Sequence, residues 1–382
     1  METFHSPFDA LNLTRWPQRK NDALRAWDAA DEYLLAHLAE QNLPKQGSHT
    51  LIVNDAFGAL SCALKDYPRS HWSDSVIARV AAAENLSVNS QAEASSNTAI
   101  DYLPSTDTPQ KTYDLVLIKI PKTMALLEDQ LIKLKPHLAE NAKIIAAGMV
   151  KHLPKSAFQL FEKHIGPLTT SLAKKKARLL FVEVNPALPS LPNPYPSEYT
   201  DEAIGLSLSN HANLFSRDHL DLGARFFLTQ FAELPAVQQV VDLASGNGVL
   251  GIKYQQLHPD ATIQFLDESY MATASAKANY ANAFDGKVES ASFRAEDGLK
   301  QLADDSVELI LCNPPFHQQH VIGEQIAMDL FHDSKRCLQT GGALWIVANR
   351  HLGYEDKLNR LFGNCRMVGA NKKFVVLRVV KR

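Results

Sequence analysis

A β-branched run passes directly into a glycine-rich turn at residues 240–251, which read Val-Val-Asp-Leu-Ala-Ser-Gly-Asn-Gly-Val-Leu-Gly. The run predicts a short buried strand, and residues 252–257 can continue the turn as a helix. Gly246, Gly248 and Gly251 have the spacing Gly-x-Gly-x-x-Gly, which allows a tight turn and lets the backbone approach a ligand closely. Strand, glycine turn and helix in this order predict the start of an α/β fold with a parallel sheet.

Two carboxylates flank this turn and bear on what it binds. Asp267 follows Gly246 by 21 residues, at the end of the next predicted strand, where a carboxylate can accept hydrogen bonds from ribose hydroxyls. Such an acid suits NAD and S-adenosylmethionine equally. Asp242 stands just before the turn, where its charge would favour a sulfonium or an ammonium group. The glycine spacing alone also fits a turn that binds no ligand, so the carboxylates carry the prediction of a cofactor.

The rest of the second half alternates predicted strands with predicted helices. This alternation is typical of a parallel sheet that is covered by helices. Residues 365–370 and 374–380 flank Asn-Lys-Lys and predict an antiparallel hairpin at one edge of that sheet. The other expected elements are strands at 261–267, 306–312 and 343–348, and helices at 269–283 and 325–337.

The first half repeats this order in a degraded form. Residues 50–60 match the strand and turn at 240–251 but keep one glycine, and residues 114–122 match 308–315. A near-constant offset of 190 to 193 residues favours a duplicated domain over the alternative that any two α/β halves look alike. The matched positions are Gly58 with Gly248, Asp74 with Asp267, and Pro121 with Pro314.

A proline-rich stretch separates the two halves. Five of the eleven residues from 186 to 196 are prolines, a composition that forms neither a helix nor an inner strand. We expect a stiff linker there, and hence two domains, residues 1–190 and residues 191–382.

Residues 313–316, Asn-Pro-Pro-Phe, follow a predicted strand at the carboxyl edge where open α/β sheets bind ligands. The two prolines fix the backbone and remove two N–H donors, so the Asn313 amide oxygen and the Pro314 carbonyl are left as acceptors for an –NH2 group. Phe316 supplies a flat surface on which a base can stack. The alternative is a strand stopped by prolines and followed by a core aromatic. Asn313 and the upstream glycine turn favour the ligand site.

These motifs resemble a known group of enzymes. Residues 242–248 together with 313–316 are similar to the class I S-adenosylmethionine-dependent methyltransferases that modify exocyclic amines. Ala244 and Ser245 stand where glycine and cysteine are usual, a departure between small residues. The resemblance implies that the two halves are tandem Rossmann-like class I methyltransferase folds, mainly parallel with an antiparallel edge hairpin.

The flanking sequence narrows the resemblance. Residues 213–223 resemble the segment that precedes the cofactor loop in bacterial ribosomal RNA guanine-N2 methyltransferases. Those enzymes pair a decayed N-terminal domain, expected to help bind RNA, with a catalytic C-terminal domain. Residues 8–17 and 27–34 are similar to the members that act on the large subunit. The expected function is therefore N2-methylation of a specific guanine in 23S ribosomal RNA with S-adenosylmethionine.

The resemblance also implies a role for each candidate residue. Asn313 and the Pro314 carbonyl would orient the guanine amine, and Phe316 would stack on the base. The residues expected to bind the cofactor are Asp242, Gly246, Gly248, Asp267 at the ribose, Asp297 at the adenine amino group, and Phe215.

Two further functions stay open. The Asn-Pro-Pro-aromatic motif also serves methylation of adenine N6 in nucleic acid and of protein glutamine amides, so the motif cannot separate these substrates. A noncatalytic RNA-binding scaffold is the third possibility. It predicts damaged cofactor motifs in both halves, whereas the second half keeps all of them.

Composition sets the remaining expectations. The chain has 39 basic and 42 acidic residues, a net charge of −3, which excludes a histone-like protein but not an enzyme with a local basic surface. Residues 174–178 and 366–382 are basic clusters that could follow phosphates. Four dispersed cysteines and no apolar run near 18 residues favour a cytosolic protein without a membrane helix. We expect a monomer without a metal, since His317 and His320 have no third ligand at metal spacing.

Overall fold

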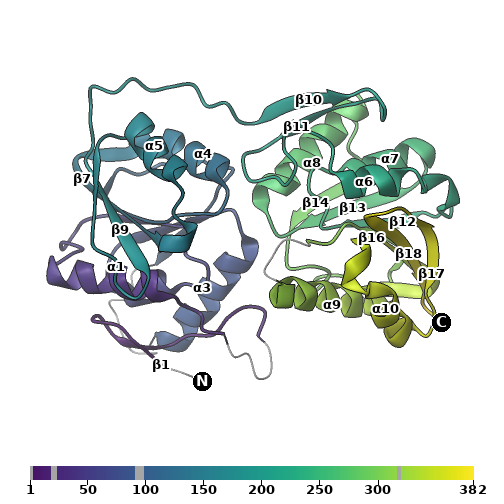
Figure 1. The fold of residues 1–382 in the computed structure, drawn as a ribbon, viewed down its shortest axis with the longest axis horizontal. Coiled ribbons are helices and arrows are strands. Elements are labelled where there is room, and N and C mark those ends of the chain that lie inside the picture. Colours follow the sequence, from purple (N-terminus) through teal and green to yellow (C-terminus); the bar gives the residue numbers. More distant parts are fainter. Residues whose placement is uncertain (1–2, 19–23, 91–98, 316–319) are drawn as a thin grey trace. The chain divides into compact units, whose positions relative to one another are not determined.

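The computed structural model describes residues 3–18, 24–90, 99–315 and 320–382, including all of their side chains except those of 320–323. The chain forms two compact units, Met1–Tyr195 and Pro196–Arg382. The division falls at the end of the proline-rich linker, a few residues after the expected 190/191. Each unit is an α/β structure in its own right (Figure 1).

The second unit is built on a seven-stranded sheet with the order β14-β13-β12-β15-β16-β18-β17. The strands from β14 to β16 are parallel, whereas β18 runs antiparallel to β16 and β17 antiparallel to β18. This topology confirms the predicted fold class with its edge hairpin. The strands are β12 (Gln239–Leu243), β13 (Thr262–Asp267), β14 (Ala291–Ala295), β15 (Val307–Cys312), β16 (Leu338–Asn349), β17 (Arg366–Ala370) and β18 (Phe374–Val380).

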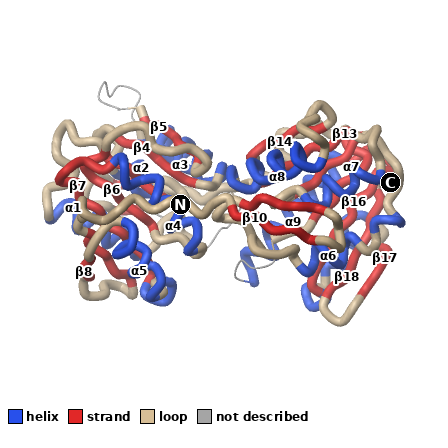
Figure 2. The backbone as a smooth tube through the Cα atoms, turned by 90° about the horizontal axis from the view of Figure 1, so that it is seen from above, coloured by secondary structure: helices blue, strands red, loops and turns tan. Residues whose placement is uncertain are grey.

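Helices cover both faces of this sheet (Figure 2). Val240 packs with α6, α7 and α8 in one core, and its neighbour Val241 packs with α9 and α10 in another. Alternation of this kind is expected for a strand that is buried on both faces. An added hairpin, β10 with β11, packs Leu206 and Leu208 into the first core. The bounds are β10 (Ser197–Asp201), β11 (Leu206–Asn210), α6 (Leu222–Leu228), α7 (Val249–Leu257), α8 (Tyr270–Ala283), α9 (His320–Cys337) and α10 (Tyr354–Phe362).

The first unit repeats this architecture strand for strand. Its sheet has the order β5-β4-β3-β6-β7-β9-β8, with the same parallel part and the same antiparallel hairpin. Helices α1, α2 and α3 share a core on one face, and α4 and α5 share a core on the other. The strands are β1 (Thr3–His5), β2 (Ala10–Asn12), β3 (Thr50–Val53), β4 (Arg69–Ser73), β5 (Ile100–Pro104), β6 (Tyr113–Lys119), β7 (Leu138–Met149), β8 (Leu168–Thr170) and β9 (Ala177–Val182). The helices are α1 (Ala29–Glu40), α2 (Ala59–Ala63), α3 (Val76–Asn89), α4 (Met124–Leu134) and α5 (Lys155–His164).

Strand register shows which residues of the two units correspond. Val53 lies opposite Trp72 and Ile118, and Leu243 lies opposite Leu266 and Cys312. The next residues along the strands therefore match Ser73 with Asp267 and Lys119 with Asn313. The sequence alignment of Asp74 with Asp267 and of Pro121 with Pro314 is wrong by one residue. Register is set by the hydrogen-bonded ladder, which an alignment of apolar runs does not resolve.

Shared local structure supports this correspondence. Gly58 and Gly248 both precede their helices with left-handed backbone, at φ 79° and 81°. Ser75 and Ser269 both cap the next helix by accepting a hydrogen bond from its third residue. No helix in the described ranges is long and apolar enough to cross a membrane.

Candidate active site

The carboxyl ends of β12, β13, β14 and β15 meet at one edge of the second sheet. From β12 the chain continues to β13 on one side of the sheet and later reaches β15 on the other side. Ligands bind in such folds in the crevice where the strand order reverses. The segments that leave this edge carry most of the predicted site residues: 244–248, 267–269, 296–298 and 313–315.

The turn after β12 holds three residues in left-handed backbone, Ala244 (φ 55°), Gly246 (φ 54°) and Gly248 (φ 81°). A Cβ atom on Gly248 would lie 3.0 Å from the Cβ of Ala276, and one on Gly251 would lie 2.4 Å from the Phe265 ring. Those two glycines therefore permit close packing inside the unit. A Cβ on Gly246 would meet no atom within 4 Å, so this part of the turn borders open space in which a ligand can lie.

Asp242 is buried in β12 and supports the turn from inside the fold. Its Oδ2 accepts a hydrogen bond of 2.8 Å from the Gly251 N–H, and its Oδ1 is buried without a partner among the described atoms. Burial raises the pKa of the Asp242 carboxyl to about 8; the Gly251 hydrogen bond opposes this shift, and the charge of Asp267 adds to it. The carboxyl thus holds the start of α7 and keeps one unused oxygen.

Asp267 connects three elements at the same edge. Its Oδ2 accepts a hydrogen bond of 2.9 Å from the Gly246 N–H, and its Oδ1 accepts one of 3.0 Å from the Ser269 N–H. The first bond fastens the glycine turn, and the second fastens the beginning of α8. Each carboxylate oxygen has two lone-pair positions, so the group can accept further bonds from a ligand.

Asp297 lies in the loop after β14 and forms an ion pair with Lys300. The neighbouring Glu296 is buried, which raises its pKa, and its backbone N–H donates to the Asp267 carbonyl at 2.8 Å. This bond brings the loop of Asp297 next to the end of β13. Asp267 and Asp297, the predicted partners for ribose and adenine, therefore lie at the ends of adjacent strands.

Asn313 follows β15 and is oriented by a carboxylate that the sequence analysis missed. The Asn313 Nδ2 donates to Asp221 Oδ2 at 3.0 Å, and the same oxygen accepts a bond of 2.8 Å from the Ala224 N–H. Asp221 is thus the N-cap of α6. The signal for it was present, because an aspartate directly before a helical run is a typical N-cap. Pro314 is buried and Pro315 is exposed, whereas Phe316 lies outside the described residues.

Phe215 lies in the segment between β11 and α6. Its side chain is 64% exposed, the next residue, Ser216, has a left-handed backbone (φ 52°), and the Asn210 side chain holds this segment through a bond of 2.7 Å to the Arg217 carbonyl. The aromatic ring therefore belongs to the surface and not to the core.

A second missed residue, Asn279 of α8, braces the glycine turn. Its Nδ2 donates to the Asn247 carbonyl at 3.0 Å, and its Oδ1 accepts from the Ser209 N–H at 2.6 Å. In the first unit Asn85 binds the Phe57 carbonyl and the Thr14 N–H in the same way. No sequence motif identifies such an asparagine, because its partners come from distant segments.

The corresponding edge of the first unit has different chemistry. Ser73 stands at the place of Asp267, so the carboxylate is absent, and Asp74 is directed elsewhere by a bond of 2.6 Å from the Ser105 hydroxyl. Lys119, at the place of Asn313, is partly buried and donates to Asp28 at 2.8 Å and to Asp31 at 2.6 Å. Lys122, the last residue of the segment that the sequence analysis matched to 308–315, is exposed.

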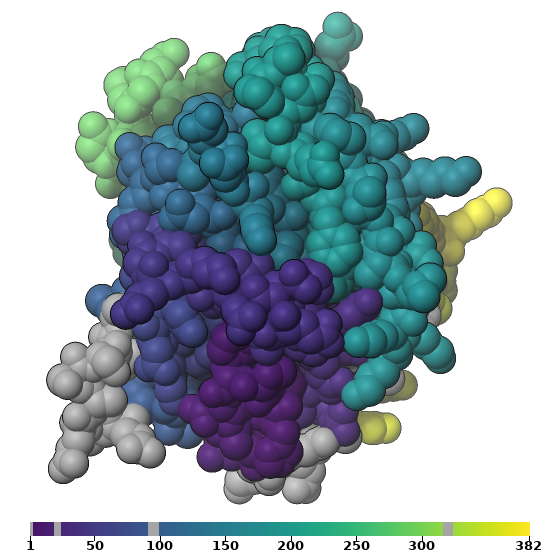
Figure 3. Space-filling view, turned by 90° about the vertical axis from the view of Figure 1, so that its left-hand side faces the viewer, coloured from purple at the N-terminus to yellow at the C-terminus, as the bar shows by residue number. Residues whose placement is uncertain are grey.

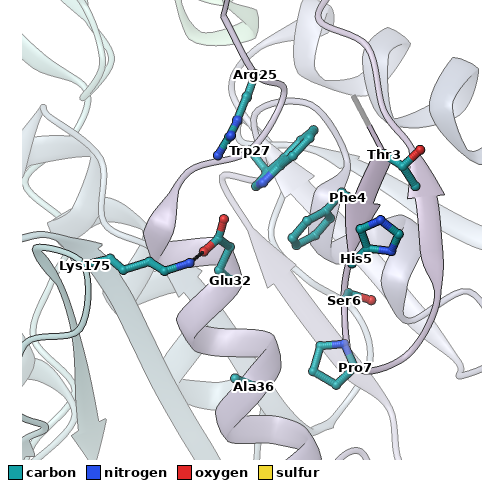
Figure 4. Close-up of a pocket in the computed structure, with 10 residues that line it drawn as sticks. All are labelled: Thr3, Phe4, His5, Ser6, Pro7, Arg25, Trp27, Glu32, Ala36 and Lys175. Atoms are coloured by element: carbon teal, nitrogen blue, oxygen red, sulfur yellow. Dashed lines mark hydrogen bonds and ion pairs between the residues drawn. The ribbon is translucent and has the colours of Figure 1, made fainter. Parts of the chain in front are cut away.

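The first unit also carries a pocket of about 340 Å³ (Figure 4). Phe4 and Trp27 stack at 4.8 Å within it, the Arg25 guanidinium lies 5.6 Å from the Trp27 ring, and Lys175 forms an ion pair of 2.6 Å with Glu32. None of its lining residues belongs to the carboxyl edge of the second sheet. The N-terminal strand and the later basic segment share this surface although they are far apart in sequence (Figure 3).

No group of three metal-binding side chains is found within the described ranges. The side chains of His317 and His320 lie outside them.

Comparison with known proteins assigns the chain to a family. Residues 1–186 match the RLMG N-terminal domain, and residues 205–378 match the methyltransferase small domain. The chain is 48% identical to the ribosomal RNA large subunit methyltransferase G of Ectopseudomonas mendocina (strain ymp), over 100% of both chains. It is 46% identical to the protein of that name from Pseudomonas aeruginosa PAO1, again over 100% of both.

The chain belongs to the ribosomal RNA large subunit methyltransferase G family. This confirms the resemblance that was inferred from the glycine turn, from the Asn-Pro-Pro-Phe motif and from residues 8–17 and 27–34. It also confirms the prediction of a methyltransferase. Among solved structures, the chain is similar to the T. thermophilus 16S rRNA N2 methyltransferase RsmC in complex with AdoMet and guanosine. The match has a TM-score of 0.77 at 19% identity and covers 100% of this chain and 98% of that one. This chain therefore shares its tandem fold with that enzyme.

Proposed function

We propose that this chain transfers the methyl group of S-adenosylmethionine to N2 of one guanine in 23S ribosomal RNA. The observation that carries the proposal is the convergence of three groups on one sheet edge: the open glycine turn, the Asp267 carboxylate and the Asn313 amide. The relatives are named as methyltransferases of large-subunit rRNA, and the solved neighbour holds AdoMet and guanosine.

The residues at this edge fit S-adenosylmethionine. Open space borders Gly246, and the Asp267 oxygens can accept from ribose hydroxyls. Asp242 would contribute from inside the fold, by holding the turn through its bond with the Gly251 N–H. Asp297 would bind the adenine amino group from the next loop. Gly248 would shape the turn around the methionine part, and Phe215 would cover the cofactor from the segment before α6. When bound, this cofactor supplies an electrophilic methyl group on a sulfonium.

The protein's own contribution is to hold the guanine amine in line with that methyl group. The amine is a weak nucleophile because its lone pair is delocalised into the ring. Two acceptors, Asn313 Oδ1 and the Pro314 carbonyl, would bind its hydrogens and favour a pyramidal nitrogen whose lone pair is available. Phe316 would stack on the base. Positioning and fixed dipoles would then supply most of the rate enhancement, and the methylated nitrogen loses its proton readily without a strong base.

The first unit would contribute RNA affinity without binding cofactor. It lacks a carboxylate at the place of Asp267, and its strand-end residue is a lysine held by two acids. Its exposed Lys176 and the pocket that contains Arg25 and Lys175 provide basic side chains for phosphates. We further expect a monomer that acts in the cytoplasm, where its rRNA substrate is assembled.

The test is methylation of 23S rRNA from a strain that lacks the enzyme, offered both protein-free and as large subunits, with methyl-labelled S-adenosylmethionine. Mass mapping should find one N2-methylguanosine. Label in adenine N6 or in a protein glutamine would instead establish one of the alternative amines.

Asn313→Ala should lower turnover about 100-fold or more, the usual effect of removing one preorganised polar contact, while cofactor affinity stays unchanged. Turnover is read from single-turnover kinetics and affinity from calorimetry. Wild-type methyl transfer by the alanine variant would contradict the role of the amide.

A further inference from the structure

Asp221 and Asn313 form a pair that joins the N-terminus of α6 to the end of β15. One carboxylate oxygen, Oδ2, accepts both the Ala224 N–H at 2.8 Å and the Asn313 Nδ2 at 3.0 Å. The helix cap and the amide are therefore held by the same atom. Because Ala224 fixes the position of the carboxylate, the carboxylate in turn fixes the amide.

This contact decides which end of the amide faces the substrate. An ionised carboxylate can only accept hydrogen bonds, so the –NH2 group of Asn313 must turn toward Asp221. The amide oxygen then points away from Asp221 and remains an acceptor. Without the carboxylate, the amide can rotate by half a turn and present its –NH2 group. An amine substrate would then meet a donor, which cannot bind its hydrogens.

Gly223 keeps this arrangement uncrowded. A Cβ atom there would lie 2.9 Å from the Asp221 Oδ2 and 3.6 Å from the Asn313 Oδ1. A side chain at this position would displace the carboxylate and cover the amide oxygen. The close approach of these two segments therefore depends on a glycine two residues after the cap.

The first unit provides an internal comparison. Asp28 caps α1 at the place where Asp221 caps α6, and it accepts a bond of 2.8 Å from Lys119, the counterpart of Asn313. The capping acid thus binds a donor at the end of the central strand in both units. The lysine, however, has no acceptor to offer a ligand, whereas the asparagine keeps one.

We propose that Asp221 is a positioning residue that locks Asn313 with its oxygen toward the substrate, and so selects an amine rather than a carbonyl at the reacting position. This inference rests on the proposed function, since it assigns Asp221 a role in presenting the target –NH2 group.

Two substitutions separate this role from helix capping. Asp221→Ser keeps a good N-cap, but its oxygen is one bond closer to the backbone and cannot reach the amide. Asp221→Asn keeps an acceptor that can serve both the cap and Asn313. The assay uses the full chain, labelled S-adenosylmethionine and 23S rRNA from a strain without the enzyme. Asp221→Ser should lower kcat by roughly 10- to 100-fold, as losses of supporting hydrogen bonds do, with unchanged cofactor affinity and melting temperature.

Asp221→Asn should recover most of that activity. In an Asn313→Ala background, Asp221→Ser should cause no additional loss, because residues that act through one contact are not additive. Wild-type turnover by Asp221→Ser, failure of Asp221→Asn to recover activity, or an equal loss in both backgrounds would each overturn the inference.

A second measurement does not depend on activity. In chain labelled with ¹⁵N-asparagine, the Asn313 –NH2 signals are identified by their loss in Asn313→Ala. Their exchange with solvent should be slow in the wild-type chain and about tenfold faster or more in Asp221→Ser, since a bond of this kind contributes about 1.5 kcal/mol or more. Equal exchange rates in the wild-type chain and in Asp221→Ser would overturn the proposal that Asp221 holds the amide in one orientation. If the chain instead methylates no guanine N2, the proposed function fails while this measurement still decides the orientation of the amide.

Discussion

At the scale of single residues, two aspartates that belong to neighbouring strands differ because their surroundings differ. Asp242 is enclosed by the fold, binds the Gly251 N–H, and has a pKa raised to about 8. Asp267 is only partly buried and binds two backbone N–H groups at the border of the open turn. The first is suited to support the turn, and the second is suited to meet a ligand.

Asp267→Ala should weaken S-adenosylmethionine binding by roughly 1.5–3 kcal/mol, the range for hydrogen bonds to a charged group. Calorimetry on the full chain measures the loss. Ser73→Ala, at the corresponding place in the first unit, is the matched control and should leave affinity unchanged. Unaltered affinity in Asp267→Ala would mean that another acid holds the ribose.

Asp242 should make stability depend on pH. Its pKa rises from 3.8 in the unfolded chain to about 8 in the fold, so the native state binds this proton more tightly. The resulting stabilisation is fully present below about pH 4 and is lost as the pH rises through about 8. Asp242→Asn removes the titration. The free energy of unfolding of this variant, relative to wild type, should therefore increase between pH 5 and pH 8 in urea titrations. A difference that is constant with pH would contradict this account.

At the scale of elements, the same strand-turn-helix unit occurs twice with different contents. In both units, a glycine with left-handed backbone precedes the helix. An asparagine of a later helix, Asn85 of α3 in the first unit and Asn279 of α8 in the second, binds a carbonyl of the turn. The second turn adds Gly246 and Gly251, which the first replaces with Ala56 and Ser61. The shared bonds preserve the backbone of the turn, while the added glycines decide how much space surrounds it.

Two alanine substitutions, one in the second turn and one in the first turn of α7, should have different main consequences. Gly251→Ala brings a Cβ atom to 2.4 Å from the Phe265 ring, so it should cost about 1–3 kcal/mol of stability by overpacking. Gly246→Ala meets no neighbour but must adopt φ 54°, a cost of roughly 1–2 kcal/mol, and its methyl group enters the space proposed for the cofactor.

Urea unfolding and cofactor calorimetry on both variants separate these effects. Gly246→Ala should lose cofactor affinity far more than its stability loss explains. Gly251→Ala should be the more unstable protein, with weaker binding only to the extent that the turn shifts. Tight cofactor binding by Gly246→Ala would show that the open space is not the cofactor site.

At the scale of the whole molecule, two units of one architecture have diverged in the groups at their sheet edges. Only the second keeps the carboxylate after its second strand and the amide after its fourth. Titration of the full chain should therefore reveal one S-adenosylmethionine site per chain. Two sites would refute the assignment of the first unit as a decayed copy.

The second unit expressed alone, from about residue 194, should bind S-adenosylmethionine but methylate 23S rRNA poorly, because the basic surface of the first unit is missing. Binding is measured by calorimetry and methylation by label transfer, each against the full chain. Full rRNA activity in the isolated second unit would refute an RNA-binding role for the first.

The α/β class, the tandem repeat and the edge hairpin could be predicted from the sequence, because these follow from local periodicity and from glycine, proline and asparagine at particular spacings. Residues 240–251 specify strand, turn and helix through contacts within a few residues of one another. The Asn-Pro-Pro motif was likewise recognisable from the sequence, since two prolines restrict the backbone locally. Phe316 and its stacking role remain a prediction outside the described residues.

The pairing of distant side chains became visible only in the folded chain. The bond between Asp221 and Asn313 spans 92 residues, and the Asn279 brace joins three segments. The burial of Asp242 depends on the start of α7 lying against its strand. The match of Lys119 with Asn313 required the hydrogen-bonded register, in which one residue of slip reverses the faces of a strand. Such contacts depend on packing between elements, and no local pattern in the chain encodes them.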